Sequence, residues 1–197
     1  MPTLEELQIA DEPAAWRALA FEVDDAACQV SSVRLQLVGK GPRRGIVGWT
    51  LTEGDAPAAA PPHPNGVVSL DHVVMLSPDL DRTVEDLRGD GFDLRRIREG
   101  ETPGGSTRQA FFRVGEPILE VVQAPEGTSV AKDPDGRARL WGLAFIVEDM
   151  EHTAASLGEL LGRPRDAVQS GRRIATLRPE AGLGPAIAFM TPGARAV

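Results

Sequence analysis

One histidine and one glutamate lie in patterns that could do chemistry together. His72 is the third residue of the run LDHVV, which begins at Leu70, and Glu120 lies in the run ILEVV. Both runs are extended in character, and in a strand each side chain shares a face with every second residue. An imidazole and a carboxylate can exchange a proton or bind a divalent metal. The alternative is that the two are polar residues that bond only to each other or to an arginine.

A second group of residues could bind an anionic or aromatic ligand. Arg108, Phe112 and Arg113 lie in one predicted strand, and a guanidinium presents a planar fork that suits a carboxylate or phosphate. Trp141, like Trp49 in a similar stretch, could flank an aromatic ligand. The plainer interpretation is that these arginines pair with some of the 29 acidic residues and that the aromatic rings pack in the core. Both interpretations are open at this point.

The elements that must position these residues form a repeat. In the first copy we expect a strand at 67–76, a helix that begins at Ser77-Pro78-Asp79 with the serine as N-cap, an extended run at 92–97, a loop at 100–106, and strands at 107–114 and 118–123. In the second copy we expect a strand at 140–147, a helix at 148–161, and strands at 172–178 and 186–190. The copies match at Asp79 and Asp149 and again at Leu87 and Leu157. One such unit cannot bury its apolar face alone, so two copies predict a paired fold.

The N-terminal part is a fainter third copy. We expect a helix at 14–21 and strands at 30–38 and 45–52, the last of which looks like the first strand of a further unit. A stretch rich in proline and glycine follows, and His63 within it is expected to be a solvated loop residue. The predicted division is a degenerate βαββ unit at 1–56, a linker at 57–66, a first clear βαβββ unit at 67–125, a connector at 126–138 and a second βαβββ unit at 139–193.

The tandem βαβββ pattern, with its LDHVV opening, its Ser-Pro-Asp-Leu helix start and its closing ILEVV strand, resembles the vicinal oxygen chelate superfamily. That superfamily includes glyoxalases, bleomycin-resistance proteins and extradiol dioxygenases. The resemblance covers about residues 66–192. It implies an α+β fold, in which paired βαβββ units form a cupped, mostly antiparallel sheet around a cleft, with the helices outside.

The resemblance also implies a metal site that this sequence only partly supplies. Metal enzymes of the superfamily place ligands on the first and last strands of both units, and His72 and Glu120 occupy such places in the first unit. In the second unit the matching positions hold Gly142 and either Ile187 or Ala188, which cannot bind a metal. If the N-terminal copy completed the site, the candidates would be Glu5, Glu6, Gln8 and Gln36, of which Glu6 and Gln36 lie nearest to the matching places.

Composition narrows the class of partner. The net charge is −8 and the sequence pI is about 4.9, with 21 scattered basic residues, so we expect no nucleic-acid partner. No apolar run approaches the roughly 20 residues that span a bilayer, and no signal peptide is evident. The single cysteine, Cys28, excludes an internal disulfide and fits a reducing compartment. We therefore expect a cytoplasmic protein, a monomer or homodimer, that contacts neither membrane nor nucleic acid.

Three functions follow from these observations. The first is a metal-independent, glyoxalase-like protein that binds a small molecule in a cleft between the paired units. The second is a metal-dependent lyase, isomerase or dioxygenase, in which His72 and Glu120 bind zinc, nickel, manganese or iron, or Glu120 moves a proton as the catalytic residue. The third is an assembly module whose N-terminal block supplies an interface. Too few metal ligands are evident for a complete site, which favours the first function.

Overall fold

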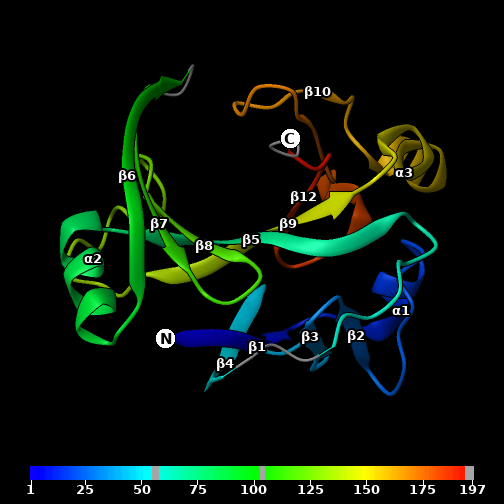
Figure 1. Ribbon diagram of the computed structural model, residues 1–197, viewed down its shortest axis with the longest axis horizontal. Coiled ribbons are helices and arrows are strands. Elements are labelled where there is room, and N and C mark those ends of the chain that lie inside the picture. Colours follow the sequence, from blue (N-terminus) through cyan, green and yellow to red (C-terminus); the bar gives the residue numbers. More distant parts are fainter. Residues whose placement is uncertain (55–57, 103–104, 194–197) are drawn as a thin grey trace.

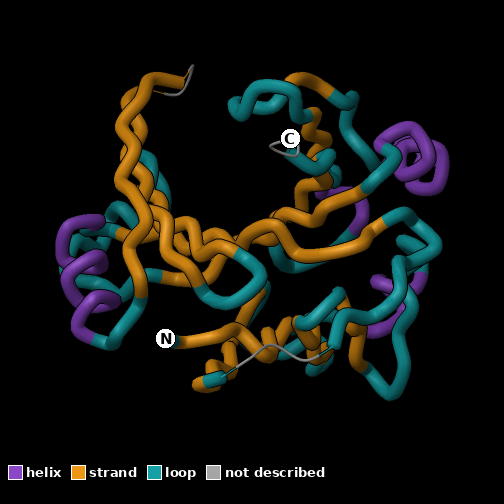
Figure 2. The backbone as a smooth tube through the Cα atoms, in the orientation of Figure 1, coloured by secondary structure: helices purple, strands orange, loops and turns teal. Residues whose placement is uncertain are grey.

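Strands dominate the molecule. A computed structural model describes residues 1–54, 58–102 and 105–193, and its strands form one eight-stranded and one four-stranded sheet (Figure 1). Short helices lie at the periphery of the sheets (Figure 2). In the part of the chain so described, no helix is both long and apolar enough to cross a bilayer.

The two clear copies build the eight-stranded sheet. The first contributes β5 (Val67–Ser77), α2 (Leu80–Gly89), β6 (Asp93–Thr102), β7 (Gly105–Arg113) and β8 (Ile118–Gln123). The second contributes β9 (Arg139–Val147), α3 (Met150–Leu157), the 3-10 helix η1 (Gly158–Leu160), β10 (Arg165–Asp166), β11 (Arg173–Thr176), the 3-10 helix η2 (Pro179–Ala181) and β12 (Ala186–Met190). The strand order is β10-β11-β12-β9-β5-β8-β7-β6.

The pairing of the strands follows the repeat. The first strand of each copy pairs in parallel with the last strand of the same copy, β5 with β8 and β9 with β12. The two first strands, β5 and β9, then pair with each other antiparallel at the centre, and the remaining neighbours are also antiparallel. The predicted α+β class, with paired units in a cupped and mostly antiparallel sheet, is confirmed.

The sheet is bent into a cup with the helices outside. Figure 1 shows the long β6–β7 arm on one side and the β10–β12 strands on the other, with β5, β8 and β9 forming the floor between them. Helix α2 packs against the outer face of β6, β7 and β8. Its residues Leu80, Val84 and Leu87 are buried, as their spacing on one helix face predicts.

The N-terminal residues form the four-stranded sheet beneath the floor of the cup. Its elements are β1 (Pro2–Ile9), α1 (Pro13–Arg17), β2 (Ala27–Val30), β3 (Val33–Leu37) and β4 (Ile46–Glu53), in the strand order β2-β3-β1-β4. Strand β1 pairs in parallel with β3 and antiparallel with β4, as β5 pairs with β8 and β9. This order supports our proposal that residues 1–56 are a shortened unit followed by the first strand of another.

The two sheets share one core. Trp16 from α1 is fully buried, and its ring lies 6.4 Å from that of Phe145 in β9. The indole Nε1 of Trp16 donates a hydrogen bond of 3.1 Å to Asp11, whose carboxylate also accepts a bond from the backbone N–H of Gly184 in the second unit. The N-terminal sheet is therefore attached to the second unit by apolar packing and by a buried carboxylate.

Several predicted boundaries of helices are wrong. Asp79, not Ser77, caps α2: its carboxylate accepts a bond from the backbone N–H of Arg82, while the hydroxyl of Ser77 bonds to the hydroxyl of Thr83. The predicted helix at 148–161 ends at Leu157, because Gly158 adopts a positive φ of 53°. Helix α1 ends at Arg17 rather than at 21, because the chain reverses soon after, with Ala20 at a φ of 56°.

Three predictions about strands and loops also need correction. The predicted strand at 30–38 covers the last residue of β2, a turn with Ser31 at a φ of 50°, and the whole of β3. The predicted loop at 100–106 is largely the end of the β6–β7 hairpin, although 103 and 104 lie outside the described residues. His63 is buried rather than solvated: its Nδ1 accepts a bond from the backbone N–H of Glu22, and its Nε2 lies 3.6 Å from the sulfur of Cys28. Burial raises the pKa of the Cys28 thiol to about 12, so this thiol is not a reactive one.

Candidate functional site

His72 and Glu120 meet on the concave face of the cup. The Nε2 of His72 lies 3.2 Å from Oε2 of Glu120, and the other carboxylate oxygen of Glu120 accepts a 2.6 Å bond from the side-chain amide of Gln109. The parallel register of β5 and β8 pairs Glu120 with Val74. Val74 is two residues after His72, so its side chain lies on the same face of the sheet. The sequence pattern therefore brings these side chains together as expected from their alternation.

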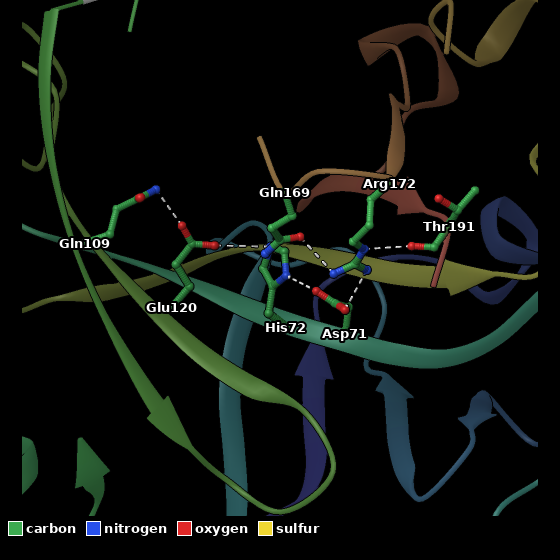
Figure 3. A network of polar contacts seen from close by, with 7 residues as sticks. All are labelled: Asp71, His72, Gln109, Glu120, Gln169, Arg172 and Thr191. Carbon is green, nitrogen blue, oxygen red and sulfur yellow. Dashed lines mark hydrogen bonds and ion pairs between the residues drawn. The ribbon is translucent and has the colours of Figure 1, made fainter. Parts of the chain in front are cut away.

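Asp71 joins the site through an irregularity in β5. The register between β5 and β9 shifts between Leu70 and His72, which is the signature of a bulge. A bulge lets consecutive side chains turn to one face, and Oδ2 of Asp71 accordingly lies 2.6 Å from Nδ1 of His72. His72 is thus held between two carboxylates, one on each ring nitrogen (Figure 3).

Arg172 extends the network into the second unit. Its guanidinium donates to Asp71 at 2.8 Å, to the side-chain oxygen of Gln169 at 2.8 Å and to the backbone carbonyl of Thr191 at 2.7 Å. Figure 3 shows this chain of contacts running from Gln109 on β7 across β8 and β5 to the start of β11. The side chain of Arg172 is only 10% exposed, so the ion pair with Asp71 is largely shielded from water.

The surroundings shift the two carboxylates in opposite directions. Burial is the main reason that the pKa of Glu120 lies above its ordinary value, although the nearby His72 opposes the shift. Burial alone would also raise the pKa of Asp71, but hydrogen bonds from His72 and Arg172 outweigh it and hold that pKa below its usual value. Asp71 is therefore the carboxyl group of the site that holds its negative charge more firmly, and Glu120 is the one that takes up a proton more readily.

The other candidates from the sequence do not join this network. Arg108 lies on the outer side, where it binds Asp81 of α2 through two bonds of 3.0 Å, and Phe112 is fully buried in the core. Arg113 is exposed at the end of β7, opposite Ile118 of β8. Trp141 is 50% exposed and lies beside another register shift between β5 and β9. Gln109 is the residue of β7 that reaches the site. Its side chain lies on the opposite face of the strand from those of Arg108 and Phe112.

The sequence pattern did not reveal Asp71, Gln169 or Arg172 as members of the site. Asp71 is the direct sequence neighbour of His72. In a regular strand, adjacent side chains point to opposite faces, so alternation predicted that Asp71 would point away from the site. Arg172 meets Asp71 across 101 positions of the chain, and no local pattern reports such a contact.

The side chains that the second unit contributes to the floor of the cup are small and apolar. Strand register places Ala144 opposite His72, and Ala188 beside Ala144. The position that corresponds to Glu120 is therefore Ala188, and the one that corresponds to His72 is Gly142. A Cβ atom on Gly142 would lie 2.9 Å from the backbone oxygen of Ala186, so the neighbouring strand leaves no room for a side chain there.

The described residues supply too few ligands for a resident catalytic metal. Asp71 orients His72 as carboxylates orient metal-bound histidines, but only His72 and Glu120 face each other as ligands, whereas a catalytic zinc usually takes three. No group of three His, Cys, Asp or Glu side chains suited to a metal occurs among the residues that the structure describes. Glu6 and Gln36 belong to the four-stranded sheet, where both contact Arg34. The donor set thus does not fit the implied metal.

Glu120 should make stability depend on pH. A carboxyl group with a raised pKa in the folded state favours folding below its unfolded pKa, and that contribution is lost as the pH rises through the folded pKa. We expect the unfolding free energy of the wild type, minus that of Glu120→Gln, to be larger near pH 4 than at pH 7 in urea titrations. Glu126→Gln, an exposed control, should show no such trend. A difference that grows with pH would mean that His72 stabilises the anion more than burial penalises it.

Several solved structures share the fold of this chain. A scan against protein-family models and a search of curated proteins give no match. Among solved structures, the methylmalonyl-CoA epimerase of Mycobacterium tuberculosis is similar at a TM-score of 0.53 and 24% identity, covering 68% of this chain and 92% of that one. The Streptomyces coelicolor methylmalonyl-CoA epimerase in complex with 2-nitronate-propionyl-CoA gives 0.52 and 25%, covering 65% and 96%. A hypothetical protein from Bacillus halodurans gives 0.52 and 20%, covering 66% and 97%.

These similarities concern the same architecture that the strand pairing displays. The two epimerase structures are covered over 92% and 96% of their own length, so the similarity extends over nearly the whole of each of those chains. Together with the cupped sheet, they agree with the fold that the sequence resemblance to the vicinal oxygen chelate superfamily implies.

Proposed function

We propose that the chain binds a small molecule on the concave face of its paired units without a resident metal. The observation that carries this proposal is the network from Gln109 to Arg172, which crosses both units in the middle of the cup. By strand register, Val74, Ala144 and Ala188 lie around it on the same face. A mostly apolar floor with a few convergent polar groups is typical of small-molecule sites.

The charges beside the network favour a ligand that carries an oxygen anion. Arg96 and Arg98 of β6 are close enough to the site for their positive charges to act on Glu120. They partly oppose the rise in its pKa that burial causes. Arg96 also lies 4.7 Å from the ring centre of Phe111. A neighbouring structure, a methylmalonyl-CoA epimerase, is a complex with methylmalonyl-CoA, an acyl thioester with a free carboxylate. We infer the same general chemistry, an acyl or keto compound with a carboxylate, for this chain.

The test is binding of methylmalonyl-CoA in the presence of EDTA, followed by two-dimensional NMR of the whole chain. We expect shifts at the His72 imidazole and along β5, β7 and β8, together with affinity reduced at least about tenfold in His72→Ala. His152→Ala is the matched control, since that histidine is exposed on α3. Shifts confined to other regions would contradict the proposal. Stoichiometric zinc, nickel, manganese or iron in untagged protein purified without chelators, or binding that needs added metal, would favour the metal-dependent alternative.

A second candidate function is proton transfer at a carbon next to a carbonyl. It is favoured by the raised pKa of Glu120 and by the contact of its carboxylate with His72, since a buried carboxylate with a raised pKa is suited to act as a general base. Glu120 would take the proton, and the electron pair of the C–H bond would move to the carbonyl oxygen as an enolate. Return of the proton would restore both the substrate and the carboxylate.

Solvent exchange separates this candidate from simple binding. In deuterium oxide, the wild type should incorporate deuterium at the methine carbon of methylmalonyl-CoA, and Glu120→Gln should lose about two to four orders of magnitude in rate. Glu116→Gln is a control outside the network, because Glu116 binds Ser31 and Ser32. Binding without any exchange above the buffer rate would leave the chain as a binding protein.

A further inference from the structure

A pocket lies on the opposite side of the sheet from the network. It has a volume of about 870 Å³ and is formed where the N-terminal sheet meets the second unit, with Met75 of β5 in its wall. Met75 is buried and alternates with Val74, which lies on the concave face, so this pocket opens on the convex side. The volume falls within the range of about 300 to 1,000 Å³ that small-molecule sites occupy.

Four arginines line this pocket, and no acidic residue does. Arg43 and Arg44 come from the segment before β4, whereas Arg137 and Arg139 come from the connector and the start of β9. All four are exposed, and none has a side-chain hydrogen bond or ion pair with another described residue. In a chain whose net charge is −8, four arginines from two units thus line one pocket without an acidic residue among them, which favours an anionic ligand there.

The pocket also has an aromatic wall. Trp49 of β4 lines it and stacks on Phe92, with the rings 6.0 Å apart and inclined by only 19°. This stacking fixes the plane of the indole, and a fixed indole is a good surface for a planar ring. Guanidinium groups, for their part, match the geometry of phosphate oxygens.

We propose that this pocket binds a phosphorylated small molecule that carries at least two phosphates and a planar ring, of the nucleoside diphosphate class. The four arginines hold the phosphates, and Trp49 contacts the ring. The site lies between the N-terminal unit and the second unit, so it is separate from the concave face, and neither site depends on the other for its chemistry.

The test uses inorganic pyrophosphate and adenosine diphosphate as probes, with titration calorimetry on the full chain. We expect both to bind, with the nucleotide tighter by about tenfold, and each of Arg43→Met/Arg44→Met and Arg137→Met/Arg139→Met to weaken both by at least about tenfold. Arg163→Met/Arg178→Met removes the same charge from exposed arginines outside the pocket and should leave both affinities unchanged. Affinity should also fall as salt is raised.

Fluorescence tests the role of the aromatic wall. Adenosine diphosphate should quench indole emission in the wild type and lose most of that quenching in Trp49→Phe, while calorimetry still detects its binding. Equal affinities for the two probes would overturn the contact between Trp49 and the ring. Equal affinities in the pocket variants and the control pair would overturn the site itself. A dimer that dissociates on Arg43→Met/Arg44→Met, seen by light scattering, would assign the surface to a second copy instead.

Discussion

Replacing Arg172 with methionine is expected to destabilise the fold by about 3 kcal/mol or more, because it leaves a largely buried carboxylate without its cation. Arg172 is 9% exposed as a residue, and its guanidinium is the partner of Asp71, whose side chain is 21% exposed. The same substitution removes the bonds to Gln169 and to the carbonyl of Thr191, which tie the start of β11 to the end of β12. Urea unfolding at pH 7 measures the effect.

Arg173→Met is the matched control for this prediction. Arg173 pairs with Glu151 on the surface, where the two side chains are 43% and 72% exposed, so its loss should cost no more than about 1 kcal/mol. The pH dependence supplies a second check. The lowered pKa of Asp71 contributes stability above its unfolded pKa that is lost as pH falls through the folded value. The gap between wild type and Arg172→Met should therefore narrow in acid, and equal costs for the two arginines at pH 7 would contradict the prediction.

Trp16→Ala is expected to cost about 3 to 5 kcal/mol, the range for truncating a large buried aromatic residue. Trp16 is fully buried, and its ring contacts Phe21 at 4.9 Å and Phe145 at 6.4 Å between centres. Its loss also removes a hydrogen bond to Asp11, which is itself only 2% exposed. Because the ring joins the N-terminal sheet to the second unit, thermal and urea unfolding should both shift markedly.

Trp141→Ala provides the control, since this tryptophan is 50% exposed and should change stability by no more than about 0.5 kcal/mol. Trp16→Phe separates packing from hydrogen bonding. It keeps most of the apolar volume but leaves Asp11 with only its bond from Gly184, so an intermediate loss is expected. If Trp16→Ala unfolded the N-terminal sheet alone, with β5 and β9 unaffected in hydrogen exchange, the shared core would not be cooperative.

The repeat could be predicted from the sequence because the strands and the helix of each unit follow one another along the chain and have recognisable local patterns. Strands β8 and β12 have the predicted bounds, since turns that contain glycine or proline border their apolar residues. Helix ends were harder to predict. Ser77 was predicted as the N-cap of α2, but Asp79 caps it. Both residue types are good N-caps, and the sequence does not tell which side-chain oxygen reaches a free backbone N–H.

The candidate site was predictable only where alternation holds. His72 and Glu120 follow the period of two and meet as expected. Asp71 breaks that period at a bulge, and Arg172 arrives from the other unit, so neither is visible in a local pattern. His63 shows the same limit: the proline-rich stretch around it looks solvated, yet it packs against Phe21 with ring centres 5.2 Å apart.

The close approach of strand β12 to Gly142 has a consequence for how this cup could change over time. A histidine at 142 would have to push aside the backbone oxygen of Ala186, so a symmetrical pair of imidazoles would need a shift of strand β12 as well as the substitution. Ala188 is partly exposed, and a glutamate at that position would face His72 across the floor. A glutamate at 188 would therefore give a site with one imidazole and two carboxylates, whereas a second imidazole at 142 would also require strand β12 to move.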